Sequence, residues 1–160
     1  MKLSTKGRYA VMAMADLAAV SGGGPVTLAD IASRQSISLS YLEQLFAKLR
    51  RAEVVTSVRG PGGGYRLSRG AAEIRISDII TAVDEPLRAT RCSSAKGCLA
   101  DGRRCVTHDL WDELGRHIFL FLSSVTLEDV TERRLLGSAS GASGRLERAP
   151  DLILDHEVAE

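Results

Sequence analysis

The sequence contains no cysteine outside one segment of 17 residues, 92–108. It also has no apolar run long enough to cross a membrane, no Cys-x-x-Cys pair, and no Lys-Ser or Lys-Thr pair after its glycine-rich stretch. These absences argue against a membrane protein, a disulfide-stapled domain, a thiol-redox enzyme and a phosphate-binding nucleotide loop. With 44% hydrophobic and 26% charged residues, the 160-residue chain has the composition of a soluble globular protein.

The N-terminus superficially resembles a secretory signal, because Lys2, Lys6 and Arg8 precede an apolar stretch. Asp16 interrupts that stretch, and no small-x-small cleavage site follows it. We therefore expect an amphipathic helix, in a cytoplasmic protein whose thiols are normally reduced and able to bind metal. The apolar residues that share one face of this helix are Ala10, Met14, Leu17 and Ala18.

Charge is distributed unevenly along the chain, although its formal net value is only +1. Residues 1–70 carry ten Lys or Arg against four Asp or Glu, a net charge of +6. Residues 71–160 carry eleven against sixteen, a net charge of −5. The basic part predicts a polyanionic partner, and the acidic part predicts a different role.

After the first helix, the sequence predicts two short helices joined by a tight turn, the pattern of a helix-turn-helix. The first of the pair covers about 28–35, and Thr27 with Asp30 suits a capping box at its start. The second begins at Ser38 or Ser40 and ends in a basic stretch at residue 51.

A β-hairpin is predicted directly after this helix pair. The β-branched run 54–58, the glycine-rich turn 59–64 and the second run 65–67 are typical of two strands joined by a turn. A hairpin in this place is the wing of a winged-helix domain. Ser77 is expected to cap a further helix that ends before Pro86.

Three cysteines and a histidine, separated by five, six and two residues, form a candidate metal site. The residues around them are too polar for buried, inert thiols, and nearby Lys and Arg favour thiolate over thiol. The four side chains suit either an iron–sulfur cluster or tetrahedral zinc, and the spacing hardly separates the two. The candidate ligands are Cys92, Cys98, Cys105 and His108.

A long helix is predicted from His108 to about Ser123, with apolar residues at intervals of three and four. This spacing is typical of a seam between two helices. We expect the seam to form a homodimer, because DNA-reading units usually work as symmetric pairs, although it suits an intramolecular face equally well. Its members are Trp111, Leu114, Ile118, Phe121 and Val125.

Together these patterns predict a mainly α-helical fold with a small β-hairpin wing. The expected parts are a winged helix-turn-helix DNA-binding domain (1–86), a ligand-bearing loop (87–107), a long C-terminal dimerisation helix (108–136) and a disordered tail (137–160).

The second helix of the helix-turn-helix is expected to read DNA. Leu42, Leu45 and Phe46 would face the core, so the polar residues between them would point outward. Such a face is either simply solvated or placed to contact base edges, where Gln pairs with adenine and Glu accepts from cytosine. Since a carboxylate repels phosphate, Glu43 would act only as a selector. The candidate DNA contacts are Ser40, Glu43 and Gln44 for bases, Ser38 and Tyr41 for phosphates or helix capping, and Arg59 with Gly60 in the wing.

Several segments, spread over about residues 1–130, resemble the IscR family of iron–sulfur cluster regulators. These segments are 6–11, 37–46, 58–65, 82–85, 89–92 and 105–111. The resemblance implies a bacterial winged-helix transcription regulator that acts as a homodimer on double-stranded promoter DNA. It also implies feedback, in which cluster-bound protein represses cluster-assembly genes and cluster-free protein still binds another class of promoter.

The same resemblance implies a 2Fe–2S cluster, with the cluster-assembly machinery as its donor. Its ligands would be Cys92, Cys98, Cys105 and His108. The segment between the second and third cysteines is one residue longer than is usual in this family, and a flexible loop at Asp101 and Gly102 is expected to absorb the extra residue.

Two alternatives remain open from the sequence. One is a zinc-stapled winged-helix repressor that senses no cluster. The other is a nitric-oxide- or iron-sensing cluster regulator of the same family. The related nitric-oxide sensors take a carboxylate ligand from the first helix, and Arg8 cannot ligate iron, which argues against that sensor.

Overall fold

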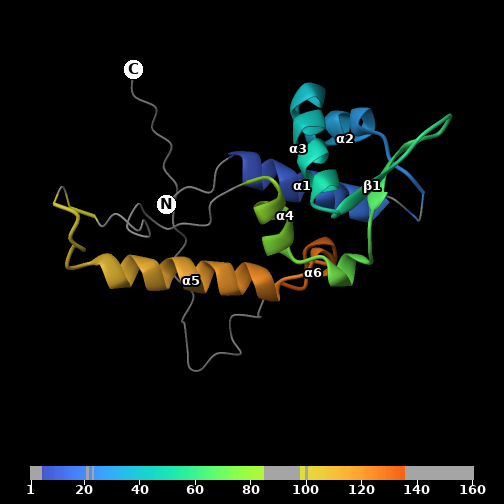
Figure 1. The fold of residues 1–160 in the computed structure, drawn as a ribbon. Coiled ribbons are helices and arrows are strands. Elements are labelled where there is room, and N and C mark those ends of the chain that lie inside the picture. Colours follow the sequence, from blue (N-terminus) through green and yellow to red (C-terminus); the bar gives the residue numbers. More distant parts are fainter. Residues whose placement is uncertain (1–4, 21, 23, 85–97, 100, 136–160) are drawn as a thin grey trace, which may run out of the picture.

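The computed structural model describes residues 5–20, 22, 24–84, 98–99 and 101–135. Figure 1 shows a mainly helical chain with one projecting hairpin, so the expected fold class is confirmed. None of the described helices combines the length and the apolarity that a membrane crossing needs. The elements are α1 (Thr5–Val20), α2 (Leu28–Gln35), α3 (Leu39–Arg51), β1 (Val55–Val58), β2 (Gly64–Leu67), the 3-10 turn η1 (Ala71–Glu73), α4 (Ile76–Ala82), α5 (His108–Ser124) and α6 (Leu127–Thr131).

The hydrophobic core lies where α1 meets α2, α3, α4 and α6. On α1, Ala10, Met14 and Leu17 are fully buried, which confirms the predicted apolar face. Small alanines beside larger side chains let the other helices approach α1 closely. Figure 1 shows α4 between α3 on one side and the long α5 on the other, so α4 separates the helix-turn-helix from the C-terminal helix.

The helix-turn-helix forms as the sequence predicts. The Thr27 hydroxyl accepts a hydrogen bond from the Asp30 N–H at 3.2 Å and donates one to the Asp30 carboxylate at 2.7 Å, which caps α2. At its other end, Ser36 takes a left-handed conformation with φ of 53°. Ile37 is buried, and Ser38 then stands at the N-cap position of α3.

The wing is a two-stranded antiparallel hairpin in which Val55 pairs with Leu67 and Val58 with Gly64. Val26 adds a short bridge to it, since Val26 and Tyr65 exchange backbone hydrogen bonds of 2.8 Å in both directions. The close approach requires glycine at position 64, because a Cβ there would lie 2.4 Å from the Val26 carbonyl oxygen. The wing is thereby held against the segment that leads into α2.

The second half departs from prediction at three points. Ser77 does not cap α4; it lies inside that helix and is buried, while Asp78 accepts a hydrogen bond of 3.1 Å from the N–H of Arg75, the N-cap residue. The helix beginning at His108 ends at Ser124, within a residue of its predicted end. The segment 108–136, expected as one dimerisation helix, therefore contains a second helix, α6, which Thr126 caps through hydrogen bonds with Asp129.

The third departure concerns Val125, which was expected on the helix seam. Val125 lies beyond the end of α5 and is only 6% exposed, because its side chain belongs to the domain core. Its carbonyl accepts a 3.0 Å hydrogen bond from Ile76, and Leu127 donates one of 2.8 Å to Ile74. These backbone contacts fix the C-terminal end of α5 to the start of α4.

Candidate DNA-reading surface and metal-ligand pair

Helix α3 presents one apolar and one polar face, as predicted. Its apolar residues Leu42, Leu45, Phe46 and Leu49 are buried, which orients the rest of the helix. The exposed residues on the opposite face include four of the candidate DNA contacts. These are Ser38, Ser40, Glu43 and Gln44.

The first turn of α3 brings two of these candidates into contact. Ser38 makes no side-chain cap to the helix; its hydroxyl instead lies 3.0 Å from the hydroxyl of Ser40. Either hydroxyl can donate in this pair, and the one that accepts keeps its own O–H for an outside acceptor such as a phosphate. Tyr41 differs from the other candidates, because it is half-buried and its ring packs edge-on against Tyr9 with centroids 6.0 Å apart.

The wing projects from the same side of the domain as α2 and α3 (Figure 1). Arg59 and Gly60 are exposed at its turn. Gly60 and Gly62 have positive φ values of 104° and 73°, a conformation that other residues rarely adopt. The turn is closed by a 2.9 Å hydrogen bond from the Gly63 N–H to the Gly60 carbonyl. The wing therefore offers one exposed arginine beside the exposed backbone of Gly60 and Gly62.

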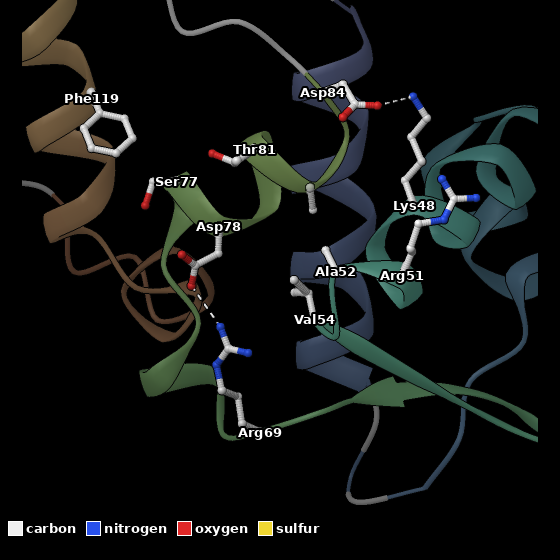
Figure 2. A pocket seen from close by; sticks show the side chains of 11 residues that line it. Lys48, Arg51, Ala52, Val54, Arg69, Ser77, Asp78, Thr81, Asp84 and Phe119 are labelled. Carbon is white, nitrogen blue, oxygen red and sulfur yellow. Dashed lines mark hydrogen bonds and ion pairs between the residues drawn. The ribbon is translucent and has the colours of Figure 1, made fainter.

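Behind this surface lies a groove of about 570 Å³ between α3, α4 and α5, which Figure 2 shows with its side chains. Two ion pairs cross it. Lys48 of α3 binds Asp84 at the end of α4 at 2.8 Å, and Arg69, just after the wing, binds Asp78 of α4 at 2.9 Å. Helix α4 is thus joined at one end to the recognition helix and at the other to the base of the wing.

The hydrogen bond from the Lys48 ammonium, together with its charge, holds the pKa of the Asp84 carboxyl below its usual range. Asp84 also has a positive φ of 55°. Sequence reasoning assigned no role to these ion pairs, because their partners lie far apart in the chain and neither follows a helical spacing. The one available signal was the presence of Asp84 in a segment that carries the family resemblance.

Two of the four candidate metal ligands meet in the structure. The sulfur of Cys98 lies 2.9 Å from Nδ1 of His108, which is the first residue of α5 and only 6% exposed. Cys105 lies near them in sequence: its carbonyl accepts a 3.0 Å hydrogen bond from the His108 N–H, and its sulfur lies 3.6 Å from the Thr107 hydroxyl. Cys92 lies outside the described residues.

The loop between Cys98 and Cys105 closes on itself. The N–H groups of Cys98 and Leu99 both donate to the Arg103 carbonyl, at 3.0 and 3.1 Å, and Gly102 donates to Leu99 at 3.0 Å. Gly102 has a positive φ of 80°. Arg103 donates backbone and side-chain hydrogen bonds to Asp101, which lower the pKa of that carboxyl. The turn at Asp101 and Gly102 can therefore accommodate the additional residue without separating Cys98 from His108.

Among the described residues, no group of three or more potential ligands is gathered at metal-binding distance. The Cys98–His108 pair is therefore the part of the predicted site that the geometry supplies. Of the other two histidines, His117 makes an exposed contact with Glu113 on α5, and His156 lies outside the described residues.

Residues 3–133 match the Rrf2 family, described as iron-dependent transcriptional regulators. The chain belongs to the Rrf2 family. It is 53% identical, over 152 residues, to the transcriptional regulator IscR of Photorhabdus laumondii. The matched region spans 94% of this chain and 92% of that relative.

Two solved structures share the fold. IscR of T. potens is 37% identical with a TM-score of 0.67, covering 91% of this chain and 93% of that one. CymR, the global cysteine regulator of B. subtilis, is 36% identical with a TM-score of 0.70, covering 83% and 98%. The expected resemblance to IscR regulators is confirmed. The chain is a DNA-binding transcription regulator of the Rrf2 family, and this role is not enzymatic.

Proposed function

We propose that this Rrf2-family protein is a cytoplasmic iron–sulfur cluster sensor that controls cluster-assembly genes, and that cluster occupancy changes its choice of promoter. The observation that carries the proposal is the Cys98–His108 contact at the start of α5, on the chain that also carries an exposed recognition helix. The identity to IscR regulators supports the same function.

The residues present fit a 2Fe–2S cluster. Thiolates and an imidazole are suitable donors to its irons, and Cys98 already lies in contact with the His108 ring. The proposed ligands are Cys92, Cys98, Cys105 and His108. With this ligand set, the cluster would supply a labile, redox-active centre whose presence reports on cluster supply. The cluster-assembly machinery is the proposed donor.

The chain itself links the ligand residues to the DNA-reading surface. His108 begins α5, and the other end of α5 is fixed to α4 by the backbone contacts at Val125 and Leu127. Helix α4 is joined to α3 through the ion pair of Lys48 and Asp84. A change in the position of α5 would therefore reach the recognition helix through packed and hydrogen-bonded elements.

At the DNA we assign different roles to the exposed residues. Ser40 and Gln44 donate to base edges and Ser38 to phosphate, while Arg59 with Gly60 enters the minor groove from the wing. Tyr41 contributes mainly by packing against Tyr9, with its hydroxyl left for phosphate. Glu43 rejects sites that offer it only acceptors, so it is the residue on which promoter choice depends.

We also propose that α5 forms the homodimer. Most apolar side chains of its C-terminal half are not covered by the chain's own core, and a helix that is apolar on most sides is normally buried. The predicted seam residues Trp111, Leu114 and Ile118 are half-buried. The more exposed residues are Leu110 (61%), Leu120 (56%), Phe121 (53%) and Phe119 (46%).

The second candidate is a zinc-stapled winged-helix regulator, because three cysteines and one histidine also suit tetrahedral zinc. The colour and the iron, sulfide and zinc content of protein purified without oxygen distinguish the cluster sensor from the zinc protein. A cluster sensor would be coloured, with iron and acid-labile sulfide bound in equal amounts, whereas a zinc protein would be colourless. Zinc without sulfide in anaerobically purified protein would overturn cluster sensing and leave the DNA-binding function standing.

Promoter choice is tested with Glu43→Ala. Cluster-bound and cluster-free protein are each titrated with two classes of promoter at one salt concentration, because affinity for DNA varies steeply with salt. If Glu43 is the selector, the alanine variant without cluster should bind the rejected class nearly as well as the cluster-bound form. The wild-type difference should be roughly 5-fold to 150-fold, the usual range of coupling between sites. A variant that keeps the full difference would show that promoter choice depends on other residues.

A further inference from the structure

Asp16 is a nearly buried carboxylate that takes no part in the proposed metal or DNA contacts. It lies on α1, and its side chain is 5% exposed. Arg34 donates to both of its oxygens, from Nε at 3.1 Å and from Nη2 at 2.7 Å. Gln35 adds a hydrogen bond of 2.8 Å to Oδ1. The carboxylate therefore receives the side chains of two successive residues of α2.

The packing of α1 against α2 does not by itself require this charged contact. The rest of the buried face of α1 is mainly apolar, and burying a charge is costly even when it is paired. Apolar residues of similar size would hold two helices together at least as well. What the charged contact adds is direction, because a guanidinium fork fixes the orientation of both partners in a way that apolar packing does not.

The two donors stand at the C-terminal end of α2, next to the turn that leads into α3. Gln35 is the last residue of α2, and only Ser36 and Ile37 separate it from Ser38 at the start of α3. Ser36 closes α2 in the left-handed conformation, and its N–H donates to the Ala32 carbonyl. A rotation of the last turn of α2 would therefore move the first turn of α3, where Ser38 and Ser40 lie.

We infer that Asp16 is a positioning residue for DNA recognition: by holding Arg34 and Gln35 it sets the place at which α3 begins, and thereby the base and phosphate contacts of Ser38 and Ser40. The inference rests on the DNA-reading surface proposed above. It assigns Asp16 no contact with DNA. It predicts that Asp16 acts on the contacts at the start of α3 and not on those of the wing.

A pair of double-mutant cycles separates this role from general stability. Asp16→Asn is combined with Ser40→Ala in one cycle and with Arg59→Ala in the other. Affinity is measured for a duplex that the wild-type protein has selected from a random library. Distant, independent sites add to within about twofold, whereas coupled sites depart from additivity by roughly threefold to tenfold or more. We expect coupling of that size with Ser40 and additivity with Arg59.

Two further variants distinguish a loss of positioning from a general loss of stability. Gln35→Ala leaves the ion pair in place and removes only the hydrogen bond from Gln35, so it should show weaker coupling to Ser40 in the same direction. Ile79→Val trims a fully buried side chain on α4 and serves as the stability control, with unchanged affinity when measured well below its unfolding temperature.

Each result has a definite consequence. Additivity of Asp16 with Ser40, or an affinity loss no larger than that of Ile79→Val, would overturn the positioning role while leaving the DNA surface intact. If Ser40→Ala and Arg59→Ala themselves leave affinity unchanged, the DNA-reading surface is misplaced and the inference falls with it.

Discussion

The sulfur of Cys98 and Nδ1 of His108 lie 2.9 Å apart, although nine residues separate them in the chain. The closed turn at Asp101 and Gly102 and the start of α5 together produce this contact. Because His108 is nearly buried while Cys98 is half-buried, the pair sits at the edge of the molecule rather than in the domain core. Loss of the pair should therefore affect metal binding more than folding.

Replacement of Cys92, Cys98, Cys105 or His108 by alanine is expected to remove the visible absorption of the anaerobic protein. Iron and sulfide content would fall with it, while the far-ultraviolet circular dichroism should be unchanged, because the core formed by the described residues does not include Cys98, Cys105 or His108. His117→Ala is the matched control, since that histidine lies on the same helix and is exposed, where it pairs with Glu113. A single-cysteine variant with full iron and sulfide content would rule out that cysteine as a ligand.

Low pH should weaken the ion pair between Asp16 of α1 and Arg34 of α2. Burial alone would raise the pKa of Asp16, but the hydrogen bonds from Arg34 and Gln35 and the charge of Arg34 outweigh it and lower that pKa below its usual value. A carboxyl with a depressed folded-state pKa adds stability above its unfolded pKa of about 3.9, and that stability is lost as pH falls through the folded value.

Asp16→Asn should consequently lower the free energy of unfolding by about 2 kcal/mol near neutral pH, a typical effect for hydrogen bonds to a charged group. The difference from wild type should shrink as pH falls below about 4. Urea unfolding at a series of pH values measures it. Asp112→Asn, which removes an i,i+4 pair on the surface of α5, is the control and should show little change at any pH. A pH-independent difference for Asp16→Asn would contradict the linkage.

The wing should depend on glycine at position 64. A methyl group there would lie 2.4 Å from the Val26 carbonyl oxygen, so Gly64→Ala must separate the wing from Val26. We expect a loss of about 1–3 kcal/mol in unfolding free energy, as for other overpacked sites, together with weaker DNA binding. Gly70→Ala makes a suitable comparison, because its added carbon would meet only the flexible end of Glu73 at 3.3 Å. Equal effects of the two substitutions would show that the contact with Val26 does not hold the wing.

Local patterns predicted much of this molecule from the sequence. The Thr27–Asp30 cap, the apolar stripe of α3 and the glycine-rich wing each depend on residues close together in the chain, and each is confirmed. The helix that begins at His108 was also correct in its bounds to within a residue.

Features that depend on tertiary contacts escaped prediction. Val125 follows the seam spacing of α5, but its side chain packs in the domain core. Thr126 then caps a separate helix, α6. Ser77 has the right residue type for a cap, but the chain turns into α4 one residue before it. The contact of Asp16 with Arg34 joins residues 18 positions apart, and no periodic pattern marks such a pair.

Dimerisation is the prediction that most directly tests the exposed face of α5. A glutamate in place of Phe121 is solvent-exposed in the single chain and so should not unfold it, but it would be buried without a partner charge in a dimer. Sedimentation velocity should then show monomers for Phe121→Glu and dimers for wild type. DNA affinity should fall steeply as well, because a monomer holds only one half-site. Ile118→Glu is less informative, since Ile118 is half-buried and its replacement also weakens the fold. Arg116→Ala, which removes only surface ion pairs with Asp112 and Glu113, should leave the dimer intact. A Phe121→Glu protein that remains dimeric would place the interface on another surface of the chain.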